Sequence, residues 1–322
     1  MAMRPVPVLL RRSSQPARCF FGLASANNTA SNTSPSSPST SPSPPSPSSS
    51  SSSSSNASSA STLHQNKETH FGFKTVREQD KELLVGSVFK NVASKYDVMN
   101  DFMSAGVHRL WKDHYIHALN PGNSTRLLDV AGGTGDIAFR FLDATRKKYG
   151  QNNDASVTVV DINPAMLEVG KQRSEALGYT ATGKISFQEG NAENLVDIPD
   201  ASVDAYTIAF GIRNCTHVDR VVAEAYRVLK PGGRFSVLEF GHVDNPLVKS
   251  IYDVYSFQVI PRLGQAVAGD AESYQYLVES IRRFPPQPVF ARMIRDAGFS
   301  VVGQGWEDLT FGVAAIHTGF KL

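Results

Sequence analysis

The stretch Arg126-Leu-Leu-Asp-Val-Ala-Gly-Gly-Thr-Gly-Asp136 decides the fold of this chain. Its apolar part, Leu127 to Val130, is short and bounded by turn-forming residues, which predicts a buried strand. Three glycines follow, and then comes a run that suits a helix, Ile137 to Lys148. Glycines let the backbone approach a ligand closely, and the start of a helix offers unpaired N–H groups. The pattern therefore predicts a nucleotide-type cradle between a strand and a helix.

The two acidic residues of this stretch, Asp129 and Asp136, indicate what the cradle binds. A phosphate site has no use for an anion there and usually carries a Lys or Arg. The glycine spacing also differs from the dinucleotide pattern G-x-G-x-x-G, and the Gly-Lys-Ser/Thr of a P-loop is missing. Carboxylates at a strand end suit a cationic ligand such as S-adenosylmethionine, which carries an amine and a sulfonium. The alternative is a tight turn that binds no ligand.

Charge is distributed unevenly along the 322 residues, whose formal net charge is +2. No acidic residue precedes Glu68, and the only charged residues up to Asn66 are four arginines, at positions 4, 11, 12 and 18. Taking these four from the 32 basic residues leaves 28 against 30 acidic ones, a balance of about −2. The remaining chain is not basic, so we expect no nucleic acid as a partner.

The first 66 residues carry two further signals. Residues 1–25 are rich in Arg, Ser and Ala and contain no acid, which predicts a mitochondrial transit peptide. A secretory signal is the alternative, but the apolar run is short and interrupted by arginines. Residues 26–66 are mostly Ser, Pro, Asn and Thr, which predicts a disordered linker before a domain at 67–322. With only Cys19 and Cys215 present, neither a disulfide framework nor a cysteine metal site is supported, and no metal is expected.

Residues 67–122 are expected to form a helical lid over the strand ends. The apolar spacing predicts one helix from Glu82 to Tyr96 and a second that contains His108 and stops at Asn120. Tyr96, Asn100 and His108 are polar enough to serve a pocket. The alternative for each is ordinary packing against the sheet.

Further strands alternate with helices after the cradle. The expected strands are Val157–Val160, Lys184–Gln188, Val203–Phe210 and Arg234–Phe240, and the expected helices are Pro164–Leu177 and Val218–Leu229. This alternation predicts an α/β fold with a doubly wound parallel sheet, whose ligands gather at the carboxyl ends of the strands. Asp161 closes the second strand, where a carboxylate can accept both ribose hydroxyls. Asn191 and Ala192 follow the third strand, where a side-chain amide and a backbone N–H can meet adenine.

The pattern loosens after Phe240. Residues 241–286 are expected to be a helical insertion with a break at Pro261, and helix Val289–Ala297 follows. The insertion could cover an apolar substrate or touch a membrane surface, although a simple packed insertion is the alternative. Phe299–Gln304 and Thr310–Phe320 are expected to close the sheet as two hairpin-like strands. No run reaches the roughly 18 apolar residues of a membrane span.

Five segments together resemble the ubiquinone/menaquinone C-methyltransferases. They are Lys95–Asp101, Asp129–Asp136, Gly190–Leu195, Phe210–Asn214 and Arg227–Arg234. The likeness extends over about residues 71–322. It implies a class I S-adenosylmethionine-dependent methyltransferase, a Rossmann-like, mostly parallel sheet of seven strands with an antiparallel last strand and helices on both faces.

The resemblance also implies site residues. Cofactor contacts are expected at Thr134, Asp161, Asn191, Ala192 and Ala209, besides Asp129, Gly133 and Gly135 of the cradle. Many relatives have Asp at the position of Asn191 and Ser at that of Ala209, so Ala209 can offer only its backbone.

Carbon methylation needs a ring activated toward phenolate, whose hydroxyl has a pKa near 10. Arg213 stays protonated, so it cannot be the direct base, but it can stabilise a phenolate or orient a water molecule. Tyr96 and His108 are candidate partners of the hydroxyl. The alternative for Arg213 is a structural clamp on an acid.

The partners follow from the same resemblance. It implies a polyprenyl benzoquinol substrate, peripheral association with the matrix face of the inner mitochondrial membrane, a multi-subunit ubiquinone-biosynthesis complex and a possible homodimer. Two alternatives stay open, a methyltransferase for another small phenol or a sterol, and a scaffold without turnover.

Overall fold

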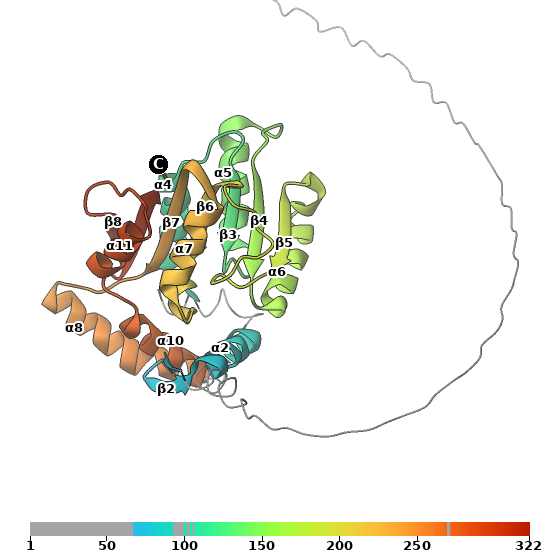
Figure 1. Ribbon diagram of the computed structural model, residues 1–322. Coiled ribbons are helices and arrows are strands. Elements are labelled where there is room, and N and C mark those ends of the chain that lie inside the picture. The colour runs from blue at the N-terminus through green and yellow to red at the C-terminus, as the bar shows by residue number, and fades with distance from the viewer. Residues whose placement is uncertain (1–66, 93–99, 102–103, 105, 269–270) are drawn as a thin grey trace, which may run out of the picture. The chain divides into compact units, whose positions relative to one another are not determined.

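The computed structural model describes residues 67–92, 100–101, 104, 106–268 and 271–322 (Figure 1). All of them belong to one compact unit, Ser54–Leu322. The expected transit peptide 1–25, the expected linker 26–66 and Tyr96 lie outside the described residues. No helix in the described ranges combines the length and the apolar character that a bilayer crossing requires.

A seven-stranded sheet forms the centre of the unit, in the order β5-β4-β3-β6-β7-β9-β8. The strands are β3 (Arg126–Val130), β4 (Ser156–Asp161), β5 (Ile185–Glu189), β6 (Val203–Ala209), β7 (Leu229–Phe240), β8 (Trp306–Leu309) and β9 (Ala314–Phe320). The strands from β5 to β7 pair in parallel, and β9 runs antiparallel to both of its neighbours. The predicted doubly wound sheet with an antiparallel last strand is therefore confirmed.

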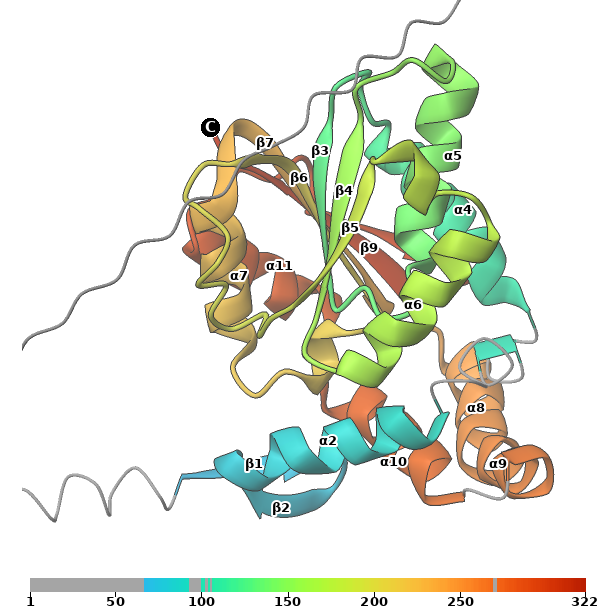
Figure 2. The ribbon, with the colours of Figure 1, turned by 90° about the vertical axis from the view of Figure 1, so that its right-hand side faces the viewer.

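Helices cover both faces of the sheet (Figure 2). One face carries α4 (Val107–Leu119), α5 (Asp136–Tyr149) and α6 (Pro164–Ala176), and the other carries α7 (Val218–Val228) and α11 (Gln287–Asp296). Leu127 and Leu128 are adjacent in β3 but belong to different apolar clusters. Successive side chains of a strand point to opposite faces, so a strand with no polar face is buried on both sides.

A further layer of elements lies at the carboxyl ends of the parallel strands (Figure 2). It contains the hairpin β1 (Glu68–Phe71) and β2 (Lys74–Arg77), then α2 (Glu78–Val92), α8 (Pro246–Val254), α9 (Ile260–Ala268) and α10 (Ala271–Arg283). Phe71 of the hairpin stacks on Tyr276 of α10 with the ring centroids 4.1 Å apart. The expected helical lid thus begins with a hairpin, and its first helix starts at Glu78 instead of Glu82.

The expected break at Pro261 was wrong. A π-helix, Tyr255–Val259, joins α8 to α9, and the chain stays helical through Pro261. The Ile260 N–H bonds the Tyr255 carbonyl, as a π-turn requires. Proline lacks an N–H and its ring clashes with the preceding turn of an α-helix, and a wider turn relieves both problems.

The expected strand Phe299–Gln304 was also wrong. The edge strand is β8, and Ser300 makes only an isolated bridge with Phe320. Gly303 and Gly305 have φ angles of 59° and 97°, in the left-handed region, so the backbone turns before Trp306. The strand can begin only after this turn. Two short single-turn helices, Thr180–Thr182 and Ile212–Asn214, complete the described elements.

Candidate active site

A pocket opens at the carboxyl ends of β3, β4, β5 and β6, where ligands of doubly wound sheets gather. Its volume is about 1140 Å³, open mouth included, and α2 lies across it with Val85, Gly86 and Phe89 in its wall. Seven of the eight residues expected to contact a cofactor line this one pocket. They are Asp129, Gly133, Thr134, Asp161, Asn191, Ala192 and Ala209.

The glycine turn between β3 and α5 forms the floor of the pocket. A Cβ on Gly132 would lie 2.7 Å from Val159 Cγ1 and 2.9 Å from the Asp129 carbonyl oxygen, so only glycine fits there. Gly133 has a φ of 52°, which disfavours any side chain. Gly135 lies outside the pocket lining and is the residue before α5, with a φ of 81°. Its glycine therefore serves the turn into the helix.

Asp129 presents a buried carboxylate oxygen to the pocket. Its Oδ1 accepts a hydrogen bond of 2.8 Å from the Thr207 hydroxyl, whereas Oδ2 has no partner in the described part of the chain. Burial raises the pKa of Asp129 to about 7, and the Thr207 hydrogen bond opposes part of that rise. A buried acceptor without a partner is costly, so Oδ2 can accept a hydrogen bond from a donor that a ligand brings.

Asp161 stands at the end of β4, next to the glycine turn. Its Oδ2 accepts from the Gly133 N–H at 2.9 Å, and its Oδ1 accepts from the Asn163 N–H at 2.8 Å. Burial raises the pKa of Asp161 to about 6, against the effect of these backbone donors. The two bonds fix the orientation of the carboxylate at the pocket wall.

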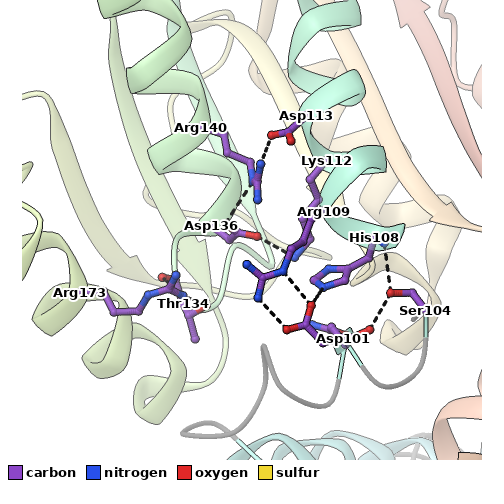
Figure 3. A network of polar contacts seen from close by, with 11 residues as sticks. Asp101, Ser104, His108, Arg109, Lys112, Asp113, Thr134, Asp136, Arg140 and Arg173 are labelled. Atoms are coloured by element: carbon purple, nitrogen blue, oxygen red, sulfur yellow. Dashed lines mark hydrogen bonds and ion pairs between the residues drawn. The ribbon is translucent and has the colours of Figure 1, made fainter. Parts of the chain in front are cut away.

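The third acid of the cradle is neutralised by neighbouring cations (Figure 3). Lys112 Nζ of α4 lies 2.8 Å from Asp136 Oδ2, and Arg140 Nε lies 3.3 Å from its Oδ1. Burial alone would raise the pKa of Asp136, but the charges of Lys112 and Arg140 outweigh it and lower that pKa. Arg173 of α6 donates to the Thr134 hydroxyl at 2.8 Å and so holds the glycine turn from the other side.

Lid helix α2 is attached to the pocket rim by polar contacts that the sequence analysis missed. The buried Lys81 ammonium donates to the Cys215 carbonyl at 2.9 Å. His217 lies between two carboxylates, with Nδ1 2.7 Å from Glu193 Oε2 and Nε2 3.3 Å from Glu78 Oε1. Cys215 and Glu193 both line the pocket, so these contacts hold the lid over it.

Comparison with known proteins identifies the family. The sequence model of the ubiE/COQ5 methyltransferase family matches residues 74–321. The chain belongs to this family. This methyltransferase is 58% identical to the mitochondrial 2-methoxy-6-polyprenyl-1,4-benzoquinol methylase of Schizosaccharomyces pombe. The alignment spans 258 residues and covers 79% of this chain and 84% of the relative. The Drosophila melanogaster protein of the same name is 56% identical over 263 residues, covering 80% and 86%.

Solved structures support the fold. The CMeT domain of the citrinin polyketide synthase aligns with a TM-score of 0.50 at 13% identity, covering 70% of this chain and 56% of that chain. Because the identity is low, this likeness concerns the fold alone. Membership of the family makes the chain a methyltransferase with S-adenosylmethionine as methyl donor, as the sequence analysis expected.

The pocket of this methyltransferase fits that donor. The unpartnered Oδ2 of Asp129 can accept from the ammonium of the methionine part, and Asp161 offers acceptors of the kind that ribose hydroxyls need. Asn191 accepts from the Glu193 N–H at 2.8 Å through its Oδ1, which orients its amide at the end of β5. The pocket therefore offers acids, a side-chain amide and backbone groups to a cationic nucleoside.

Two of the residues expected to be catalytic, Arg213 and His108, do not line the described pocket of the methyltransferase. Arg213 is buried behind it. Its Nη1 donates to Glu239 Oε1 at 2.9 Å and to the Phe210 carbonyl. The guanidinium carbon lies 5.4 Å from the centroid of the Phe240 ring. Arg213 Nε has no partner in the described ranges. The acid that pairs with Arg213 is far away in the sequence, and no motif marked it.

His108 is likewise buried, on α4. Its Nε2 lies 2.9 Å from Asp101 Oδ1, where Arg109 also binds, and burial lowers the pKa of the imidazole despite this carboxylate (Figure 3). Tyr96 lies outside the described residues. The catalytic roles of Arg213, His108 and Tyr96 stay predictions.

Proposed function

We propose that this methyltransferase transfers a methyl group to a ring carbon of 2-methoxy-6-polyprenyl-1,4-benzoquinol, in ubiquinone biosynthesis. The product would be the 5-methoxy-2-methyl-3-polyprenyl-1,4-benzoquinol. The observation that carries the proposal is the 56–58% identity to relatives named for this reaction over most of both chains. The structure supports the proposal with a pocket whose buried acid, Asp129, has an oxygen that can pair with the cationic methyl donor.

The proposed roles of the pocket residues follow from their chemistry. S-adenosylmethionine supplies an activated methyl group on a sulfonium. Asp129 would bind the ammonium, Asp161 the ribose hydroxyls, and Asn191 with the Ala192 N–H the adenine, whereas Ala209 could offer only backbone. Thr134 and the glycines would shape the floor of the pocket around the methionine part of S-adenosylmethionine. We expect no metal ion in this arrangement.

For Arg213, the contacts favour a positioning role over a direct one. The guanidinium bonds the carbonyl of Phe210, whose φ of 55° is strained for a residue other than glycine, and both Phe210 and Gly211 line the pocket. A phenolate-stabilising role could use Nε, a buried donor without a described partner. An Arg213→Lys variant separates the roles, because loss of turnover alone supports catalysis and equal loss of cofactor affinity supports positioning.

We extend the proposal to the setting of the enzyme. Residues 1–25 would direct it to mitochondria, where an apolar tail on the substrate requires peripheral association with the matrix face of the inner membrane. Membership of a multi-subunit ubiquinone-biosynthesis complex and a homodimer are part of this proposal. A methyltransferase for another small phenol or a sterol is the competing function.

The test is methyl transfer by the purified chain to a short-tailed, reduced 2-methoxy-6-prenyl benzoquinol, followed by mass spectrometry. We expect a ring-bound methyl group on this quinol and no product from a sterol or a simple phenol. An Asp161→Asn variant is the control for dependence on the pocket. Cofactor binding by titration calorimetry without methylation of the quinol would refute the proposed substrate, and absence of cofactor binding would favour the scaffold.

A further inference from the structure

An exposed apolar stripe runs along α8 into the π-helix that follows it. Leu247, Ile251 and Val254 are 71%, 64% and 52% exposed, and Phe257 and Val259 extend the exposed apolar surface. At about 100° per residue, the first three side chains fall within an arc of roughly 60°. Isolated exposed apolar residues are ordinary, but an aligned row of them marks an interaction surface.

The orientation of this stripe is fixed by the opposite side of the same helix. Ser256 and Ile260 are buried, and Ile260 and Tyr255 pack in the apolar cluster that also contains Trp111. The Arg282 guanidinium of α10 lies 5.0 Å from the centroid of the Tyr252 ring. The helix is therefore anchored on one side. Leu247, Ile251 and Val254 face away from the protein, and Phe257 stands at the edge of the stripe, with its ring centroid 5.6 Å from the Arg282 guanidinium carbon.

The charges around the stripe have a small positive excess. Asp253 is the only acid between residues 246 and 268. It pairs with Lys249 at 2.9 Å and also with Arg282, and Arg262 is exposed on α9. Exposed Asp244 precedes α8 by two residues, so three cations accompany two acids beside an aliphatic row. This combination is typical of helices that lie in the interface of a membrane with anionic lipids.

A second copy of the chain fits the stripe less well. Stable protein interfaces take roughly 20–30 residues from each partner and are rich in Tyr and Trp at their centre. The exposed row has five apolar residues, four of them without a polar atom or an aromatic ring. A bilayer needs no complementary shape, so a narrow aliphatic row is sufficient for it.

We propose that the α8 stripe, Leu247, Ile251, Val254, Phe257 and Val259, binds the surface of a bilayer that contains anionic lipid. This inference rests on the proposed function, because a substrate with a polyprenyl tail resides in a bilayer. Contacts connect the stripe to the pocket. α9 packs on α10, and the Tyr276 hydroxyl of α10 donates at 3.0 Å to Asn214, which lines the pocket. The enzyme would then face the membrane with the end of the sheet that carries the pocket.

Sedimentation with phosphatidylcholine vesicles, with and without cardiolipin, tests the proposal on the full chain. A Leu247→Gln/Ile251→Gln variant should lower the partition coefficient at least about tenfold, because two aliphatic side chains no longer enter the lipid. Val302→Gln is the matched control, since Val302 is 79% exposed in a loop away from this helix. Arg262→Gln should weaken binding to the cardiolipin vesicles only.

Unchanged binding of the Leu247→Gln/Ile251→Gln variant would overturn the inference. A shift in oligomeric state of this variant by light scattering, without a change in vesicle binding, would assign the stripe to a second copy and also overturn it. Methylation of the short-tailed quinol in solution should be unaffected by the substitutions. Failure of that reaction in the unaltered chain would refute the proposed function. Vesicle binding would still decide, independently of methylation, whether the stripe binds a bilayer.

Discussion

Replacing Asp129 by Asn removes the charge of the pocket's buried acid and almost nothing else. The side chains have the same shape, and the Thr207 hydroxyl can still donate to Oδ1. In the enzyme, Oδ2 would pair with the ammonium of S-adenosylmethionine. Breaking a buried ion pair costs about 3 kcal/mol or more, so we expect the affinity for S-adenosylhomocysteine to fall about a hundredfold near pH 7.5.

The same substitution should change how affinity depends on pH. Asp129 has a pKa of about 7 without ligand, and it must be ionised to pair with the ammonium. The affinity of the unaltered enzyme should therefore fall about tenfold per pH unit below pH 7, with Asp161, whose pKa is about 6, adding to the slope only below pH 6. At still higher pH the α-amino group of the ligand loses its own proton and affinity falls again.

The free energy of unfolding of the ligand-free chain should change with pH in the direction opposite to the ligand affinity. The pKa of Asp129 in the folded, ligand-free protein is raised from 3.8 to about 7, so the folded state holds the proton more tightly than the unfolded state. Stability is full below pH 3.8 and is lost as pH rises through the window to 7, by up to about 4 kcal/mol. Without ligand at pH 8, Asp129→Asn should therefore melt at a higher temperature than the unaltered chain.

Titration calorimetry with S-adenosylhomocysteine from pH 6 to pH 9 measures the first two effects, and calorimetric melting measures the third. In buffers of different ionisation enthalpy, the unaltered enzyme should release about one proton on binding near pH 6.5, and the variant only the small fraction that Asp161 contributes. A flat affinity of the unaltered enzyme between pH 6 and 7 would refute the reasoning, as would an Asn variant that keeps the slope.

Three further changes test other parts of the site. Lys81→Met removes the hydrogen bond that holds the lid helix, and stopped-flow fluorescence should show cofactor release about tenfold faster. Gly132→Ala places a Cβ 2.9 Å from the Asp129 carbonyl, which should destabilise the chain by about 2 kcal/mol in urea unfolding and abolish cofactor binding; a loss smaller than that of a surface Gly→Ala change would contradict the geometry. Glu239→Gln leaves the buried Arg213 without its counter-charge, and scanning calorimetry should show a melting temperature about 10 °C lower.

Local signals in the sequence were sufficient for the sheet and the cradle. The run before the glycines is apolar on both faces because β3 lies between two helical layers, and a run of this kind predicts a central parallel strand. The acids that end β3 and β4 meet because parallel strands bring their carboxyl ends to one edge. Five expected contact residues therefore reached one pocket from local patterns alone, and the family resemblance added Thr134 and Ala209.

Long-range contacts explain what the sequence could not predict. Lys81 is an ordinary lysine on an amphipathic helix until the fold buries it against Cys215, 134 positions away. The partner of Arg213 is Glu239, in the middle of an apolar strand where no pattern marks an acid as an ion-pair partner. The edge strand at Trp306 depends on two glycines whose left-handed φ angles decide where the turn ends. None of these features leaves a periodic signal.

The two pocket acids show why a site of this kind is unstable without its ligand. In water, the carboxylates of Asp129 and Asp161 would keep their hydration, but the fold buries both and so raises both pKa values. Hydrogen bonds from Thr207, Gly133 and Asn163 offset only part of that desolvation. Ligand binding would offset more of it, because Asp129 gains the ammonium as a partner and Asp161 gains the ribose hydroxyls as donors. Binding energy and folding stability are therefore linked through the same carboxylates, and a substitution that improves one should weaken the other.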